Sequence, residues 1–231
     1  MIIKSFELAK IDFKNHYFFL LYGQNEGLKN QIIDTKFKNL YDEGMYIYEE
    51  NEILQNEEVF FNSVLSKSFF EKKKLIIISR TTDKIKDLIE ELFVKKVEDL
   101  TLVLNAETLE KKSKLRSFFE KNKETICVPF YEDNNQTLNS IVSQFFRNKK
   151  IPISQQLINV LIDRCRGDRK NLNNELEKIE NFSLNKKSIN LKEIIKLTNL
   201  ADNYSASELI DQCLAKNTRK TVTILNENNY S

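Results

Sequence analysis

The chain has 231 residues, of which 36 are Lys or Arg and 34 are Asp or Glu, so its net charge is only +2. This balance excludes nucleic-acid binding through a general excess of positive charge, and any such contact must come from a local patch. Hydrophobic residues make up 41% of the chain, which is typical of a globular protein and excludes a disordered one. With only 4 glycines and 2 prolines, helices should dominate.

Residues that hold metals or form covalent intermediates are scarce. The three cysteines, Cys127, Cys165 and Cys213, are far apart, which argues against a metal site and against a disulfide framework. His16 is the only histidine, and no catalytic residue is evident. No apolar run approaches the roughly 20 residues of a membrane helix, and no signal peptide is apparent. We therefore expect a cytoplasmic protein that has no metal, no cofactor and no membrane partner.

Five short apolar runs predict β-strands, and helical patterns lie between them. The runs are residues 18–22, 45–48, 75–78, 102–104 and 126–128. They are continuous rather than alternating, which is typical of a parallel sheet buried on both faces. The clearest helical pattern is Ile85, Leu88, Ile89, Leu92 and Phe93. Another is suggested by Leu109, Leu115, Phe118 and Phe119. This alternation predicts a doubly wound α/β domain.

The pattern changes after Tyr131. Residues 132–136 are a polar break, and only helical patterns follow it. We predict an α/β domain over residues 1–136 and a small all-helical domain over residues 137–204. Residues 205–231 are expected to begin a further helical domain that is cut short.

The first predicted strand leads into a segment with the length of a phosphate-binding loop, GxxxxGK[ST]. Gly23 and Lys29 fit this pattern, whereas Leu28 replaces the second glycine and Asn30 replaces the residue whose hydroxyl binds magnesium. No Asp-Glu pair follows the strands at 75–78 or 102–104. These losses predict a degenerate phosphate loop without ATP hydrolysis. The alternative is that Gly23 merely turns a strand into a helix and that Lys29 is solvated.

Three segments together resemble the delta-subunit family of bacterial DNA polymerase III clamp loaders, a branch of the AAA+ proteins. They are FFLLYGQN at residues 18–25, VLSKSFFEKKKLIII at residues 64–78, and GDRKNLNNELEK at residues 167–178. The resemblance implies a P-loop NTPase-like (AAA+) parallel-sheet domain followed by a small all-helical lid. The collar domain of the family would be only begun in this chain.

The same resemblance implies a function without catalysis. A delta subunit binds the sliding clamp (beta subunit) and opens it for loading onto primed DNA, while neighbouring subunits hydrolyse ATP. Its other partners are the gamma/tau and delta-prime subunits, and the assembly serves a DNA-directed DNA polymerase. By position in the second segment, the clamp-binding wedge is Phe69 and Phe70, with Ser68 before them and Leu65 one turn earlier. Neighbouring aromatics cannot both face inward from one helix, although packing of both in the core is the alternative.

Two groups of basic residues are candidates for DNA contact. Lys111, Lys112, Lys114 and Arg116 lie on one predicted helix, and Arg147, Lys149 and Lys150 form a second group. Either could contact phosphates, and the alternative is a solvated face. An acidic run, Glu49, Glu50, Glu52, Glu57 and Glu58, is expected to be solvated surface.

Two other functions remain open. The first is an active NTPase of the clamp-loader group, which would bind ATP through Lys29. The second is a structural subunit like delta-prime. Relatives of delta-prime usually carry zinc-binding cysteines in the first domain, and this chain has no such cluster.

Overall fold

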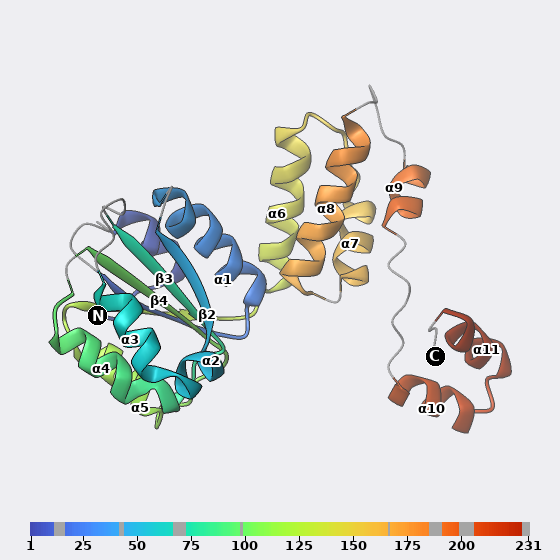
Figure 1. The fold of residues 1–231 in the computed structure, drawn as a ribbon. Helices are drawn as coiled ribbons and strands as arrows, with labels where there is room; N and C mark the ends of the chain where they lie inside the picture. Colours follow the sequence, from blue (N-terminus) through green and yellow to red (C-terminus); the bar gives the residue numbers. More distant parts are fainter. Residues whose placement is uncertain are drawn as a thin grey trace. The chain divides into compact units, whose positions relative to one another are not determined.

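The computed structural model of the chain describes residues 1–11, 17–41, 44–66, 73–97, 99–165, 167–184, 191–198 and 206–227. The chain divides into two compact units, Met1–Glu132 and Asp133–Ser231. The first unit combines strands and helices, and the second contains helices (Figure 1). Within the described residues, no helix is both long enough and apolar enough to cross a membrane.

The first unit is built on a five-stranded sheet in the order β2-β3-β4-β1-β5, in which every paired strand is parallel. The strands are β1 (Phe18–Gly23), β2 (Met45–Glu49), β3 (Lys74–Ser79), β4 (Leu100–Ala106) and β5 (Thr125–Phe130). All five predicted strands are therefore confirmed. Because parallel strands share a direction, the carboxyl ends of β1, β3 and β4 meet at one edge of the sheet.

Helices cover both faces of this sheet: α1 (Glu26–Ile32), α2 (Glu50–Gln55), α3 (Glu57–Leu65), α4 (Lys86–Val94) and α5 (Lys114–Lys121) (Figure 1). Successive side chains of a strand point to opposite faces. Phe18 and Leu20 accordingly pack in a core with residues of α3, α4 and α5. Phe19 and Leu21 pack on the other face, with residues that follow α1. Burial on both faces explains why β1, β3, β4 and β5 read as continuous apolar runs. The expectation of burial is wrong for β2, which lies at the edge of the sheet and has mostly exposed side chains.

Helix α5 is shorter than the sequence pattern suggests. The hydroxyl of Ser113 accepts a hydrogen bond from the backbone N–H of Arg116 at 3.1 Å, so the helix begins at Lys114. The expectation that one helix carries both Leu109 and Lys111 is therefore wrong. The capping hydroxyl of Ser113, rather than the apolar spacing, decides where this helix begins.

The acidic run is not entirely solvated. Glu50 is buried, and its Oε1 accepts hydrogen bonds from the N–H and the hydroxyl of Thr82 and from the N–H of Ile85. The expectation of a solvated side chain is wrong for Glu50, which ties the start of α2 to the turn before α4. The other four glutamates of the run are exposed, as expected.

The second unit is a helical bundle. Its helices are α6 (Asn135–Asn148), α7 (Gln155–Arg164), α8 (Arg169–Ser183) and α9 (Leu191–Leu197), followed by α10 (Ala206–Leu214) and α11 (Thr218–Glu227). Leu138 and Phe146 of α6, Leu161 of α7 and Leu172 of α8 are buried together in its core. Every helix or strand that the structure describes after Tyr131 is a helix, as predicted, while the assignment of residues 205–231 to a collar stays a prediction.

Candidate functional site

Gly23 ends β1 in a backbone conformation that favours glycine, with a φ of 125°. A Cβ atom at this position would lie 2.1 Å from the carbonyl oxygen of Phe130. The N–H of Gly23 donates to the carbonyl of Glu107 at 3.0 Å. The first glycine of the phosphate-loop pattern is therefore required by close packing between the ends of β4 and β5.

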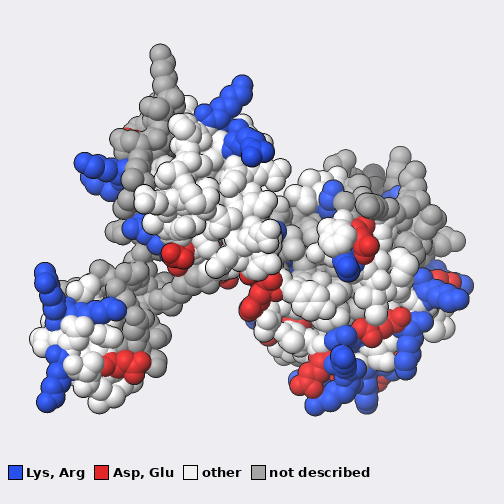
Figure 2. All heavy atoms as spheres, turned by 180° about the vertical axis from the view of Figure 1, so that it is seen from behind, with Lys and Arg blue, Asp and Glu red and all other residues white. Residues whose placement is uncertain are grey.

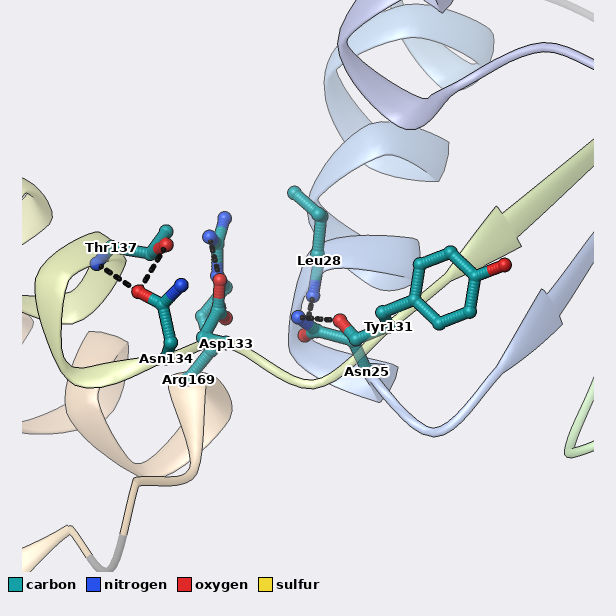
Figure 3. A network of polar contacts seen from close by, with 7 residues as sticks. All are labelled: Asn25, Leu28, Tyr131, Asp133, Asn134, Thr137 and Arg169. Atoms are coloured by element: carbon teal, nitrogen blue, oxygen red, sulfur yellow. Dashed lines mark hydrogen bonds and ion pairs between the residues drawn. The ribbon is translucent and has the colours of Figure 1, made fainter.

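Asn25 caps helix α1 and ties it to the chain after β5 (Figure 3). Its Oδ1 accepts a hydrogen bond from the N–H of Leu28 at 3.0 Å, and its Nδ2 donates to the carbonyl of Tyr131 at 3.0 Å. In a working phosphate loop, the N–H groups at the start of this helix face the nucleotide. Here a buried side chain of the loop itself uses one of them.

Lys29 points into the protein instead of toward a phosphate or into solvent. Its side chain is 0% exposed, and its Nζ donates to the carbonyl of Ala106 at 2.5 Å. Glu26 forms an ion pair with the same ammonium group. The charge of Lys29 is balanced within the chain, so the expectation of a solvated Lys29 is wrong, and reaching a phosphate would require breaking both contacts.

Replacing Lys29 with methionine is expected to lower the free energy of unfolding by about 1–3 kcal/mol, because the buried carbonyl of Ala106 loses its donor. Lys38 is the matched control: it pairs with Asp34 at 2.7 Å, but its side chain is 36% exposed. Lys38→Met is expected to cost less than about 0.5 kcal/mol. Urea denaturation of both variants measures the difference, and equal losses would contradict the structural role of Lys29.

The strand ends beside this loop lack the carboxylates of an ATPase. Ser79 and Asn105 lie opposite each other at the ends of β3 and β4. Arg80, which follows, pairs with Glu49 at 3.3 Å. The Oδ1 of Asn105 and the hydroxyl of Thr81 are buried without a hydrogen-bond partner among the described residues. Neutral oxygen atoms thus stand where an acidic pair would hold magnesium.

The predicted clamp-binding wedge lies in the connection between α3 and β3. Leu65, the last residue of α3, is 42% exposed. The Nζ of Lys74 donates to the carbonyls of Ser63 at 2.7 Å and Ser66 at 3.1 Å, and it lies 5.4 Å from the ring of Tyr46. The first residue of β3 is thereby tied to the end of α3. Ser68, Phe69 and Phe70 lie outside the described residues, as does His16.

The basic residues predicted for DNA contact separate into two kinds. Lys111, Lys112 and Lys114 are exposed. Arg116 faces the protein: its guanidinium donates to Glu120 at 2.7 Å and to the carbonyl of Leu109 at 3.1 Å, and it stacks on the ring of Tyr22. Of the second group, Arg147, Lys149 and Lys150 are exposed, and Lys149 pairs with Glu180.

Sequence reasoning missed an ion pair in the second unit. The guanidinium of Arg169 donates to both carboxylate oxygens of Asp133, at 2.6 Å each (Figure 3). Both side chains are largely buried, with 10% and 7% exposed. Asp168, predicted to cap a helix, accepts from the N–H of Asn171 at 2.8 Å. Asp168 therefore caps the start of α8, and Arg169, the first residue of α8, binds the chain segment just before α6.

Two of the three cysteines, Cys127 and Cys165, are buried, and Cys213 is exposed. Burial raises the pKa of Cys127 and of Cys165 to about 12, so both stay protonated thiols near neutral pH. Among the residues that the structure describes, no group of three or more metal-ligating side chains is placed to hold an ion.

Comparison with known proteins gives one family and several related folds. Residues 19–129 match the model of the family "DNA polymerase III, delta subunit". The Bacillus subtilis DNA clamp loader delta protein is similar over 96% of this chain and 69% of its own, with 18% identity and a TM-score of 0.57. Thermotoga maritima RuvB, a Holliday junction branch migration motor, is similar over 93% of this chain and 74% of its own, with 14% identity and a TM-score of 0.54. No curated protein matches the sequence.

Because the two solved structures are only 18% and 14% identical to this chain, they support a shared fold and nothing further. The predicted fold class, a P-loop NTPase-like sheet domain followed by a helical domain, is confirmed.

Proposed function

Because residues 19–129 match the model of the DNA polymerase III delta-subunit family, we propose that this chain belongs to that family, and that it binds the sliding clamp and opens it for loading onto primed DNA. The gamma/tau and delta-prime subunits would be its partners in the loader, acting in the cytoplasm. Clamp opening needs only that the subunit bind an opened ring more tightly than a closed one, because such differential affinity shifts the equilibrium between the two.

The observation that carries this proposal is the connection between α3 and β3. Leu65 presents an apolar side chain to solvent at the end of α3. Lys74 binds the carbonyls of Ser63 and Ser66, which holds together the two ends of the connection that contains the predicted wedge. A short segment with restrained ends and adjacent aromatics suits insertion into an apolar pocket of a partner.

We further propose that the chain does not hydrolyse ATP. Three features support this: Lys29 is neutralised by Glu26, Leu28 stands in place of the second loop glycine, and Asn30 stands in place of the magnesium-binding hydroxyl. Clamp binding is therefore expected to proceed without nucleotide. Added Mg-ATP should leave the thermal unfolding midpoint unchanged, since a ligand stabilises a protein only by binding its folded state.

The wedge is tested by the double variant Phe69→Ala/Phe70→Ala. Its affinity for the purified clamp is expected to fall tenfold to a hundredfold, because burying one large aromatic contributes about 1.5–3 kcal/mol. The measurement is a titration against the clamp without ATP, with circular dichroism to establish that the variant is folded.

Val59 supplies a matched control for this experiment. It is an apolar residue of α3 with 67% of its surface exposed, and Val59→Ala should leave clamp affinity unchanged. If the folded double variant binds the clamp as tightly as the unaltered chain, the wedge assignment is wrong. Clamp binding that requires ATP would argue against the non-catalytic role.

A further inference from the structure

A cavity of the first unit lies at the amino ends of the strands, on the opposite edge of the sheet from Gly23 and Asn105. Its volume is about 500 Å³, and its lining comes from the start of β1, the end of α4 and the turns before β4 and β5. The lining includes four apolar or aromatic residues and two carboxylates: Tyr17, Phe18, Phe93, Val97, Asp99 and Glu124. We refer to this cavity as the amino-edge pocket.

The aromatic side of the amino-edge pocket is held by the core and by the sheet. Phe18 is buried, and its ring meets that of half-buried Phe93 edge to face, with centroids 5.4 Å apart. The side chain of Tyr17 is 45% exposed, and its carbonyl accepts a hydrogen bond from the N–H of Leu102 at 2.6 Å. These contacts fix the aromatic residues in place, and Tyr17 remains open to a ligand.

The charged side of the pocket has an excess of negative charge. Asp99 and Glu124 are exposed, and Lys96, which also lines the pocket, is exposed too. None of these three side chains forms an ion pair with another residue that the structure describes. Two carboxylates against one ammonium group leave one negative charge. The pocket therefore favours a cation over a neutral or anionic group.

The turn that carries Lys96 and Asp99 is tied to its neighbours. Both residues have a left-handed backbone, with φ values of 46° and 59°, which is uncommon outside glycine. The N–H of Lys96 donates to the carbonyl of Phe93 at 3.3 Å, and the carbonyl of Asp99 accepts from the N–H of Lys74 at 2.8 Å. The turn is therefore bonded both to the end of α4 and to the start of β3.

We infer that the amino-edge pocket binds an arginine side chain of a partner polypeptide. A guanidinium group is a planar cation that stacks on aromatic rings and pairs with carboxylates through two parallel hydrogen bonds. The pocket offers both kinds of contact, and its exposed rim suits a side chain that projects from a polypeptide. In the view from behind, basic and acidic side chains are interspersed along the lower part of the first unit (Figure 2). Recognition therefore depends on contacts within the pocket, because mixed surface charges are screened over longer distances.

The test is a titration of the full chain with the tripeptide acetyl-Gly-Arg-Gly-amide, followed by two-dimensional NMR of the backbone amides without clamp. Binding in the millimolar range is expected, with shifted signals for the residues of the amino-edge pocket. The citrulline tripeptide has the same shape without the charge, and it should bind at least about tenfold more weakly. Tyr17→Ser should weaken binding of the arginine tripeptide about twofold to fivefold, since it removes the exposed ring.

The variant Asp99→Asn/Glu124→Gln is expected to lose at least about tenfold in affinity for the arginine tripeptide and to bind the citrulline tripeptide as before. Asparagine tolerates the left-handed backbone at position 99. The matched control is Glu57→Gln/Glu58→Gln, which removes the same charge from exposed residues outside the pocket and should keep the affinity.

Equal losses in these two variants, equal binding of the arginine and citrulline tripeptides, or no binding by the unaltered chain would overturn the inference. A lysine tripeptide that binds as tightly as the arginine one would overturn the assignment to arginine. The site goes beyond the proposed clamp binding, and its test contains no clamp. Failure here is therefore distinct from failure of the proposed function.

Discussion

Replacing Asp133 with alanine is expected to lower the free energy of unfolding of the second unit by about 3–5 kcal/mol, because it strands a buried guanidinium without its counter-charge. Arg169 donates to both carboxylate oxygens at 2.6 Å, and its side chain is only 10% exposed. Such a group cannot recover its lost partner by turning to water. Urea denaturation of the full chain, followed by circular dichroism, measures the loss.

Two further variants separate this effect from the loss of any surface charge. Lys149 and Glu180 also form an ion pair, but both side chains are 37% exposed. Glu180→Ala should therefore cost less than about 1 kcal/mol. The double variant Asp133→Leu/Arg169→Leu should recover much of the stability lost in Asp133→Ala, because it leaves no unpaired buried charge. A loss for Asp133→Ala no larger than that for Glu180→Ala would contradict the prediction.

Gly23→Ala is expected to lower the stability of the first unit by about 2–5 kcal/mol, combining the cost of a left-handed backbone with that of overpacking. The new methyl group would lie 2.1 Å from the carbonyl oxygen of Phe130. That oxygen belongs to the backbone of β5, so no side-chain rotation can relieve the contact. The expected result is a lower midpoint of urea denaturation, measured on the full chain.

Gly167 provides the comparison for Gly23. Its φ is also positive, at 73°, but the nearest atom to an added Cβ is Cδ1 of Leu138 at 4.0 Å. Gly167→Ala therefore meets the backbone penalty alone, about 1–2 kcal/mol. Similar losses in the two variants would mean that the close approach of β5 to Gly23 contributes nothing.

The sheet could be predicted from the sequence because its signal is local. Each strand is a short apolar run, and the run at residues 75–78 lies inside β3. Burial on both faces demands continuous apolar side chains, and this requirement is visible without knowing the partners. The start of α5 was misjudged because the apolar spacing extends back to Leu109, whereas the capping hydroxyl of Ser113 decides where the helix begins.

The polar contacts could not be predicted because their partners are distant in the chain. Glu50 binds Thr82 and Ile85, which lie 32 and 35 residues further on. Asp133 and Arg169 are 36 residues apart. The acceptor of Lys29 is the carbonyl of Ala106, 77 residues away, and a backbone carbonyl has no residue type to recognise. For Phe69 and Phe70 the sequence motif is still the whole argument.

The buried contact between Lys29 and Ala106 bears on how the lysine of a phosphate-loop motif is interpreted. Lys29, which stands at the lysine position of the phosphate-loop pattern, here joins α1 to the end of β4, so its contribution to stability does not depend on a bound nucleotide. Reintroducing glycine at position 28 and threonine at position 30 would restore the letters of the motif and leave Glu26 still competing for the ammonium group. A lysine at this place in the loop therefore does not by itself indicate a nucleotide site, because the contacts of its ammonium group can lie entirely within the chain.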